Sequence, residues 1–264
     1  MSSNLLIKII LTPLIIAAAT LVARRWGERI GGLMIGLPLT SGPVSIFFAL
    51  EQGPAYAASA TKGSILGLIP VAVFCAGYVK SARRLPWYLA AAFSIGLYLV
   101  SVWAVSNLTP GLAWEAIVVP LALVAGTFAI GDMEGQNRAV QSPWWDLSVR
   151  MATATTLVIL ITGSASALGP KWGGLLSPFP IFTFVMVTFS HSQGGAGAAW
   201  SLIRGVLPCL FSYTAFFIVV TLLAENASLP VVYSLAALTA LGVNGAALAL
   251  ILWRKRAPKG ITPP

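Results

Sequence analysis

The stretch Ile30–Pro43, "IGGLMIGLPLTSGP", decides the fold, because it is apolar enough for a membrane helix and yet contains residues that break helices. Proline inside a helix costs about 3 kcal/mol relative to alanine. This stretch holds two prolines, four glycines and the hydroxyl side chains of Thr40 and Ser41. A span that is broken in this way needs a reason, which we sought in the rest of the chain.

The composition of the 264-residue chain is typical of a membrane protein with many spans. It is 58% hydrophobic and 9% charged, with a mean hydropathy of +0.88, which is unlike any soluble domain of this size. Apolar windows of about 19 residues recur along most of the chain, and the short alternating strands of a membrane β-barrel are absent from the sequence. We therefore expect an all-α polytopic membrane protein.

Nine transmembrane helices are predicted. The first apolar run is kept as a span, because the N-terminus lacks the basic region and the clear cleavage site of a signal peptide. The thiols of Cys75 and Cys209 fall inside spans and are expected to be packing residues. The third and eighth spans have alternative starts near Gly53 and Gly195. The predicted spans are Leu5–Ala23, Ile30–Leu50, Gly63–Tyr78, Pro86–Ser106, Gly111–Ile130, Leu147–Leu168, Trp172–Ser190, Gly205–Leu223 and Leu229–Trp253.

The basic residues predict the orientation of these spans. Thirteen lysines and arginines lie on the side of the loops that follow the odd-numbered spans, and three lie on the other side: Lys8, Lys62 and Lys171. Cytoplasmic loops are enriched in lysine and arginine, so we expect the N-terminus outside and the C-terminus in the cytoplasm. These clusters account for the net charge of +9, and nucleic acid is not expected as a partner.

An internal repeat relates the two halves of the chain at an offset of 142 residues. From Gly31 to Gly63, nine of 33 positions are identical to those from Gly173 to Gly205. The matches include helix breakers and polar positions as well as apolar ones. Paired in this way are Gly53 with Gly195, Pro38 with Pro180, Ser59 with Ser201, Lys62 with Arg204 and Glu51 with Gln193.

The repeat predicts a 4+1+4 architecture. Spans 1–4 correspond to spans 6–9, and an extra fifth helix between them turns the second half upside down. This inverted topology is common among secondary transporters. The predicted parts are a first four-helix repeat (1–106), a linking helix with a cytoplasmic loop (107–146), and a second, inverted repeat with a basic tail (147–264).

Paired breaks in spans 2 and 7 suggest a substrate site between the halves. Broken helices at matching places in both halves are the best sequence indication of such a site in a transporter, although a kink that only improves helix packing is an equal alternative. The stripe of Gly197, Ser201 and Gly205 is expected to serve close helix packing. The candidate substrate-binding residues are Pro38, Thr40, Ser41, Ser177, Pro178, Pro180 and Thr183.

Four further residues are candidates for coupling or charge pairing. Glu51 and His191 are placed to carry a coupling proton, and the alternative for each is a polar residue at the water interface. Lys62 and Arg204 would favour an anionic substrate if they lie deep, since Lys62 is about 13 Å into a span that starts near Gly53. The favoured alternative is that both mark the membrane boundary.

The remaining acidic residues are expected near water. Glu115 stands near the start of the fifth span and is predicted to be interfacial. Asp132, Glu134 and Asp146 belong to the polar segment 131–146, which links the repeats and is predicted to be solvated.

Three stretches of the chain resemble GlpM-like proteins, which are small bacterial inner-membrane proteins about as long as one half. These stretches are "LLIKIIL", "GGLLSPFPIFTF" and "AAWSLIRGVLP". The first half keeps the early Leu-x-Ile-Lys pattern loosely at Leu6, Ile7 and Lys8. The second half keeps the Gly/Pro/Phe/Pro segment around Gly174–Pro180, with one proline displaced by Ser177, and His191 follows. The resemblance implies a duplicated four-helix unit in a bacterial inner membrane and no particular mechanism.

The sequence favours a small secondary transporter or permease for a small polar or anionic solute. The alternative is a non-transporting membrane scaffold that assists the assembly of envelope polysaccharide or lipid. With seven acidic residues, one histidine and no metal-ligand spacing such as HExxH, we expect no enzyme, no metal and no cofactor. No phosphate-binding loop is present, so ATP-driven transport by this chain alone is not expected. The expected partners are the lipid bilayer and the solute, and a homo-oligomer is compatible with such a unit.

Overall fold

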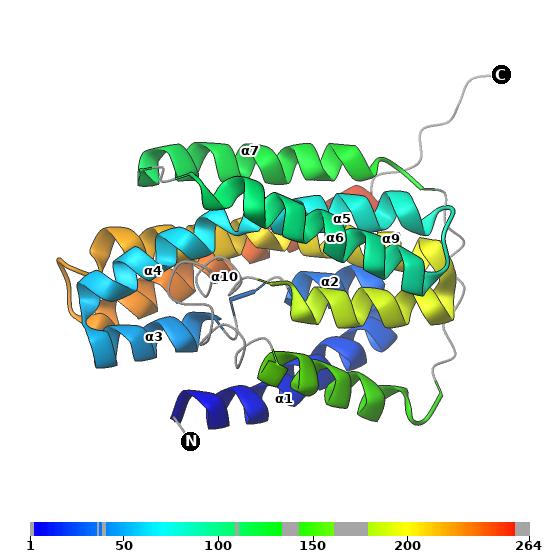
Figure 1. The fold of residues 1–264 in the computed structure, drawn as a ribbon, viewed down its shortest axis with the longest axis horizontal. Helices are drawn as coiled ribbons and strands as arrows, with labels where there is room; N and C mark the ends of the chain where they lie inside the picture. The colour runs from blue at the N-terminus through cyan, green and yellow to red at the C-terminus, as the bar shows by residue number, and fades with distance from the viewer. Residues whose placement is uncertain are drawn as a thin grey trace.

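The computed structural model describes residues 3–35, 37–38, 41–108, 111–133, 143–160 and 179–256, and within these ranges it is helical with no strand (Figure 1). Residues 146–160 form a helix that carries no label in the figure. The labelled helices are α1 (Ser3–Trp26), α2 (Glu28–Ile35), α3 (Ser41–Gln52), α4 (Pro54–Leu66), α5 (Leu68–Ala82), α6 (Trp87–Ser106), α7 (Leu112–Ile130), α9 (Ile181–Leu223) and α10 (Leu229–Arg256).

Five helices in the described residues are long and apolar enough to cross a membrane. The outer helices α6, α7 and α10 also turn large apolar side chains outward, among them Trp103, Phe128 and Leu238, of which Phe128 is 80% exposed. A soluble protein does not expose apolar surface on this scale. The chain is therefore an all-helical membrane protein, as its composition predicts. The five helical stretches are Pro54–Ala82, Trp87–Ser106, Leu112–Ile130, Ile181–Leu223 and Leu229–Leu250.

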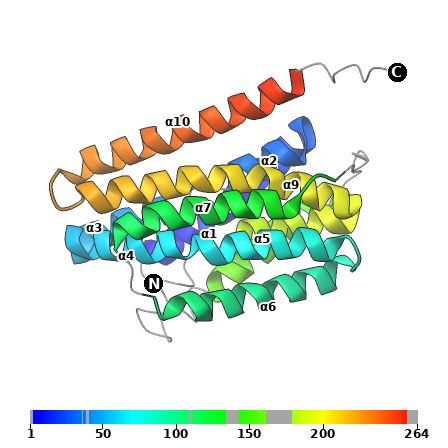
Figure 2. The ribbon, with the colours of Figure 1, turned by 90° about the horizontal axis from the view of Figure 1, so that it is seen from above.

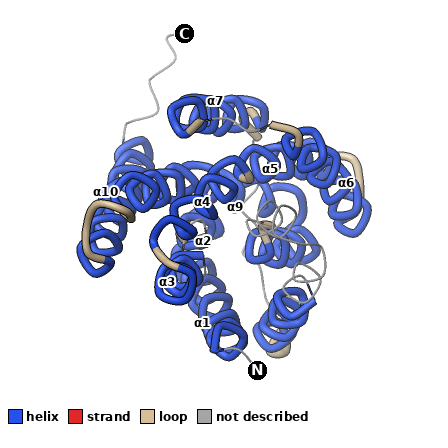
Figure 3. The backbone as a smooth tube through the Cα atoms, turned by 60° about the vertical axis from the view of Figure 1, so that its left-hand side comes forward, coloured by secondary structure: helices blue, strands red, loops and turns tan. Residues whose placement is uncertain are grey.

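The helix α9 is the centre of the bundle. Figure 3, which views the molecule at a steep angle to the long axis, shows α9 surrounded by the other helices, and α9 contacts α1, α2, α4, α5, α6, α7 and α10. Its core side chains, such as Leu202, Ile203 and Phe217, are almost completely buried. Figure 2 shows α10 along one side of α9 and α6 on the far side of α5.

Close packing between α2 and α9 depends on two glycines. A Cβ atom at Gly205 would collide with the backbone carbonyl of Arg29, and one at Gly32 would collide with that of Leu202. Only glycine lets the two backbones approach this closely. The predicted role of Gly205 in close helix packing is confirmed, and its partner is α2 in the first half of the chain.

Two glycines with left-handed backbone interrupt the helices at matching positions. Gly53 has a φ of 93° between α3 and α4, and Gly195 has a φ of 73° inside α9. This φ region is open to glycine and costs other residues free energy. Gly195 divides α9 into a short segment, 181–194, and a long segment, 196–223. The two glycines are 142 residues apart, which is the offset of the sequence repeat.

The helix starts follow the same offset. α6 begins at Trp87 and α10 begins 142 residues later at Leu229. In Figure 1, α6 runs from right to left and α10 from left to right. Likewise α4 and α5 run from left to right, whereas the long segment of α9 returns from right to left. Helices 142 residues apart therefore run in opposite directions along the bundle.

The predicted break in the second span is present. α2 ends at Ile35, Leu37 and Pro38 are not helical, and α3 begins at Ser41. Pro180 caps the start of α9. The helix in the third predicted span begins at Pro54, which is the earlier of the two predicted starts.

Candidate functional site

The starts of α3 and α9 lie near the middle of the bundle and point their helices to opposite ends. In Figure 1, α3 runs from the middle to the left edge and the short segment of α9 runs from the middle to the right. The free backbone N–H groups at a helix start carry a partial positive charge. Two such starts therefore face the interior of the molecule.

Tyr213, on the long segment of α9, reaches the start of α3. Its hydroxyl lies near the hydroxyls of Ser41 and Ser64 without the geometry of a hydrogen bond to either. The neighbouring Phe216 packs against Gly42, which holds the first turn of α3 against α9. Tyr213 is 6% exposed. A buried hydroxyl without a partner is rare, because losing its bond to water costs about 1–3 kcal/mol.

Tyr98, on α6, reaches the start of α9 in the same way. Its ring meets Phe179 edge-on at 5.0 Å between centroids, and Phe179 precedes the Pro180 cap. Tyr98 is completely buried, and its hydroxyl has no hydrogen-bond partner. The hydroxyls of Tyr98 and Tyr213 are close enough to interact electrostatically. Two unpartnered hydroxyls therefore lie between the two helix starts.

The predicted substrate-binding residues divide into two groups. Pro38, Pro180 and Thr183 are buried at the breaks, and Ser41 is half-buried beside Tyr213. Thr40, Ser177 and Pro178 lie outside the described residues. The sequence did not single out Tyr98 or Tyr213, because a tyrosine in an apolar span has the same pattern whether its hydroxyl is paired or not.

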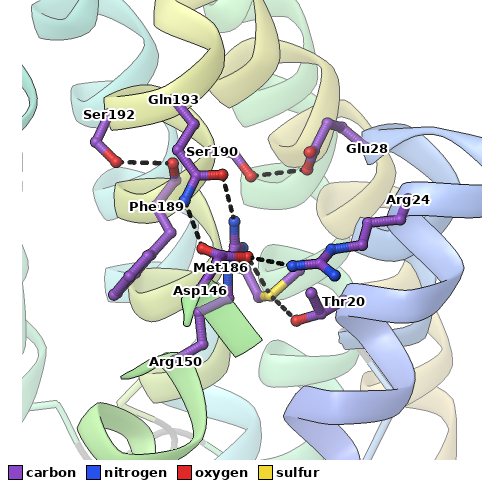
Figure 4. Close-up of polar contacts among 10 residues, drawn as sticks. All are labelled: Thr20, Arg24, Glu28, Asp146, Arg150, Met186, Phe189, Ser190, Ser192 and Gln193. Atoms are coloured by element: carbon purple, nitrogen blue, oxygen red, sulfur yellow. Dashed lines mark hydrogen bonds and ion pairs between the residues drawn. The ribbon is translucent and has the colours of Figure 1, made fainter. Parts of the chain in front are cut away.

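A second polar cluster lies at one end of the bundle, where Asp146 begins the helix 146–160 (Figure 4). Asp146 is completely buried. It accepts hydrogen bonds from Arg150 Nε at 2.9 and 3.0 Å, from Arg24 Nη2 at 2.8 Å, and from the Gln193 amide. These donors come from the helix 146–160, α1 and the short segment of α9. One carboxylate therefore joins three helices.

Arg150 is the other buried charge of this cluster. It is 3% exposed, lies over the ring of Phe189 at 5.0 Å, and donates to Gln193 Oε1 at 3.4 Å. Its Nη1 also contacts the sulfur of Met186 at 3.3 Å, to which Thr20 donates. Such charge-assisted bonds are roughly twice as strong as neutral ones, so the cluster holds its helices firmly.

The electrostatics of this end set two carboxylates apart. Burial would raise the pKa of Asp146, but the hydrogen bonds from Arg150, Gln193 and Arg24 and the charge of Arg150 hold that pKa below its usual range. Burial raises the pKa of Glu28, the first residue of α2, although a 2.7 Å hydrogen bond from Ser190 and the charge of Arg150 oppose this. Glu28 is therefore easier to protonate than an ordinary carboxylate.

The prediction that Asp146 is a solvated loop residue is wrong, since Asp146 is buried in an ion pair. Glu115, predicted to be interfacial, is 2% exposed on α7. The spacing of Asp146 and Arg150, one helical turn apart, is the sequence signal that could have placed both at a helix start. Glu28 was also missed, because it lies among the arginines of a short loop.

The predicted coupling residues have different surroundings. His191 is buried, and its Nδ1 lies 3.3 Å from the Tyr78 hydroxyl. Glu51 lies on α3, and its side chain is outside the described part. Arg204 pairs with Asp132 at 2.6 Å and lies over Trp200 at 4.8 Å. Lys62 is exposed on α4 near Glu115 of α7. The structure therefore does not bring Lys62 and Arg204 together.

Several of these contacts mark one end of the bundle, which we call the basic end. Here Arg83 donates to the carbonyl of Ile130 at 3.0 Å, which joins the ends of α5 and α7. Arg24, Arg150 and Arg204 make the ion pairs already described. Among the described residues, no three His, Cys, Asp or Glu side chains gather to hold a metal ion. The opposite end holds the α3–α4 and α9–α10 turns.

Comparison with protein-family models, with curated proteins and with solved structures found no match to this chain.

Proposed function

We propose that the chain forms nine membrane spans arranged as two inverted four-helix halves joined by α7. The sequence repeat supports this, as do the left-handed glycines Gly53 and Gly195 and the opposite directions of α6 and α10. The first half is 1–106, the link is 107–146 and the second half is 147–264. The resemblance to GlpM-like proteins fits a duplicated unit of this kind.

The basic end faces the cytoplasm in this proposal. Arg24, Arg83 and Arg150 lie there with most of the other basic residues, and lysine and arginine are retained on the cytoplasmic side of membranes. The N-terminus is then outside and the basic tail inside. We assign the protein to a bacterial inner membrane.

The function is secondary transport of a small polar solute through a site between the halves. One observation carries this assignment: the hydroxyls of Tyr98 and Tyr213 are buried without partners between the starts of α3 and α9. A protein that only packs helices would gain free energy by replacing each tyrosine with phenylalanine. A solute that accepts hydrogen bonds from them explains why the hydroxyls are there.

The chemistry around the tyrosines favours an anionic or strongly hydrogen-bond-accepting solute. Ser41 and the first amides of α3 supply donors, and Thr183 stands in the first turn of α9. Both helix starts add partial positive charge, and half-helix starts bind anionic groups in other transporters. Each tyrosine hydroxyl can add one hydrogen bond. A small carboxylate or inorganic anion has acceptors for all of these groups.

A proton is the coupling ion that the charged groups support. Glu51 and His191 remain candidates from the sequence. Glu28 joins them because burial raises its pKa and it lies beside the Asp146 cluster. The opening of the basic end would hydrate Glu28 and allow it to release a proton.

Uptake of radiolabelled small anions into proteoliposomes tests the assignment. We expect saturable uptake of at least one anion, and we expect Tyr98→Phe and Tyr213→Phe to raise KM or abolish uptake. Tyr88→Phe, which is the same change at an exposed position of α6, should leave uptake unchanged. Normal uptake by the Tyr98→Phe/Tyr213→Phe double variant would refute the site. Absence of uptake across the panel, with a folded protein, would favour the scaffold.

A further inference from the structure

The Asp146 cluster connects the two proposed halves of the molecule. Arg24 belongs to the first half, whereas Asp146, Arg150 and Gln193 belong to the second. Asp146 and Arg150 are almost completely buried, so this end of the bundle is closed in the structure (Figure 4). A carrier must open this end to release solute there, and opening it must break the cluster.

The repeat gives each second-half member of the cluster a counterpart in the first half. At the 142-residue offset, Asp146 corresponds to Asn4, Arg150 to Lys8 and Gln193 to Glu51. Asn4 and Lys8 are one helical turn apart near the start of α1, as Asp146 and Arg150 are in their helix. Glu51 precedes Gly53 by two residues, and Gln193 precedes Gly195 by two.

The chemistry of the two sets is the same, with acid and amide exchanged. One set is Asp, Arg and Gln, and the other is Asn, Lys and Glu. Each has one carboxylate, one cation and one amide, but the carboxylate has moved from the first helix to the second. In Gln193 and Asp146 the amide donates to the carboxylate, and the exchange preserves a donor–acceptor pair. Unrelated drift would not be expected to keep all three roles.

We propose that the Asp146–Arg150–Gln193 cluster is a latch at the basic end and that Asn4, Lys8 and Glu51 form the equivalent latch at the opposite end. The proposal rests on the proposed transport function. In one state the first latch is made and the second is broken, and in the other state the reverse holds. The side chains of the second set lie outside the described part of the structure, so the repeat and the helix positions carry their assignment.

Arg24 adds a contact that only the latch at the basic end has. Its counterpart at the offset is Ser166, which is uncharged. The basic end therefore has one ion pair more than its equivalent, and this favours the state in which the basic end is closed. The structure shows this state.

Labelling of one reporter cysteine from each side of the membrane tests the two latches. The reporter is Ser41→Cys beside Tyr213, in a Cys75→Ala/Cys209→Ala background, and the probe is a membrane-impermeant thiol reagent applied to vesicles of both orientations. Asp146→Asn should raise the labelling rate from the basic end and lower it from the other. Glu51→Gln should do the opposite. We expect changes of roughly 5-fold or more, since coupling free energies of this kind start at about that size.

Exchanging acid and amide provides the sharper test, because it restores composition without restoring sequence. Asp146→Asn/Gln193→Glu gives the basic end the acid and amide order of the other set, and Asn4→Asp/Glu51→Gln does the reverse. Each double variant should return labelling toward the wild-type rates. Asp132→Asn, which breaks the exposed pair with Arg204, is the control and should change neither rate.

Single variants that shift labelling in the same direction, or double variants that do not restore it, would overturn the proposal. If Asp146→Asn does not accumulate as folded protein, the double variant, which keeps a carboxylate at this end, decides the point. The labelling needs no known substrate. Opposite shifts without measurable uptake would therefore refute the transport assignment alone, whereas normal uptake without opposite shifts would refute the latches alone.

Discussion

Asp146 shows how one side chain can hold several helices together in an apolar environment. Its two oxygens accept bonds from Arg24, Arg150 and Gln193, which come from three helices. A buried carboxylate is costly unless it is paired and hydrogen-bonded, and removing the partner of a buried charge is costlier still. The stability of the basic end should therefore depend on this carboxylate more than on any exposed charge.

Replacing Asp146 with asparagine should destabilise the protein strongly. The change leaves Arg150 buried and Arg24 partly buried without their counter-charge, and we expect a loss of about 3 kcal/mol in the free energy of unfolding. Thermal unfolding in detergent measures it. Asp132→Asn is the matched control, because Asp132 is 86% exposed in its pair with Arg204 and should leave the unfolding temperature unchanged.

The loss should depend on pH in the direction set by the lowered pKa of Asp146. A carboxylate with a lowered pKa in the folded state stabilises the protein above its ordinary pKa, which is about 3.8, and this contribution is lost as the pH falls through the lowered value. The gap between wild type and Asp146→Asn should therefore be full at pH 6 and narrow below pH 4. A gap that is the same at all pH values would contradict the ion-pair account.

Glu28 should show the opposite pH dependence. Its pKa is raised in the folded state, so folding binds a proton, and stability falls as the pH rises from the ordinary value of about 4.5 through the raised one. Glu28→Gln removes this penalty and can still accept a bond from Ser190. We expect the variant to gain stability relative to wild type as the pH rises above 4.5. Unfolding temperatures between pH 4.5 and 8 measure this, and a constant difference would exclude the buried carboxylate.

At the scale of elements, the close crossing of α2 and the long segment of α9 holds the two halves together. Gly32 and Gly205 stand where each helix meets the backbone of the other. Without a hydrophobic driving force between helices in lipid, such close van der Waals packing is a main source of association. The crossing is therefore sensitive to a single methyl group.

Gly205→Ala should destabilise the protein by about 1–3 kcal/mol, the range for overpacking a well-packed site. Gly242→Ala is the matched control, because Gly242 lies within α10 and a Cβ there meets nothing within 4 Å. It should be neutral or slightly stabilising, since alanine is the better helix former. Unfolding in detergent compares the two. Equal effects would show that the close crossing contributes little.

Most of the helices could be predicted from the sequence because apolar periodicity and loop residues are local signals. α6 and α7 begin within one residue of the predicted spans at Pro86 and Gly111. The break before Ser41 and the turn at Gly53 were also evident, since proline and glycine leave few alternatives. The start of α4 at Pro54 was less certain, because Lys62 suggested a boundary inside what is a continuous helix.

The polar clusters could not be predicted to the same extent, because they depend on helices that are far apart in the chain. Asp146 and Gln193 are 47 residues apart, and Ser45 and Tyr233, which share a hydrogen bond, are 188 apart. Which face of a span each residue occupies is decided by tertiary packing. For the same reason nothing in the local sequence distinguishes Tyr98 and Tyr213, whose hydroxyls lack partners, from Tyr233, whose hydroxyl has one.

At the scale of the whole molecule, the account describes a carrier with a site at its middle and a latch at each end. The site lies where Tyr98 and Tyr213 meet the starts of α3 and α9, and the latch at the basic end is closed. Inverted halves give the two states of such a carrier nearly the same construction. A channel or a scaffold would need neither paired breaks nor paired latches.

Counterflow in proteoliposomes tests this account most directly. Vesicles are loaded with a high concentration of an unlabelled anion that the uptake screen identifies, and a trace of the labelled anion is added outside. An alternating-access carrier should accumulate the label transiently above its equilibrium level, because unlabelled anion leaving the vesicles returns the site to the outside. The account predicts this overshoot and its loss in the Tyr98→Phe/Tyr213→Phe variant. A simple approach to equilibrium without an overshoot would contradict it.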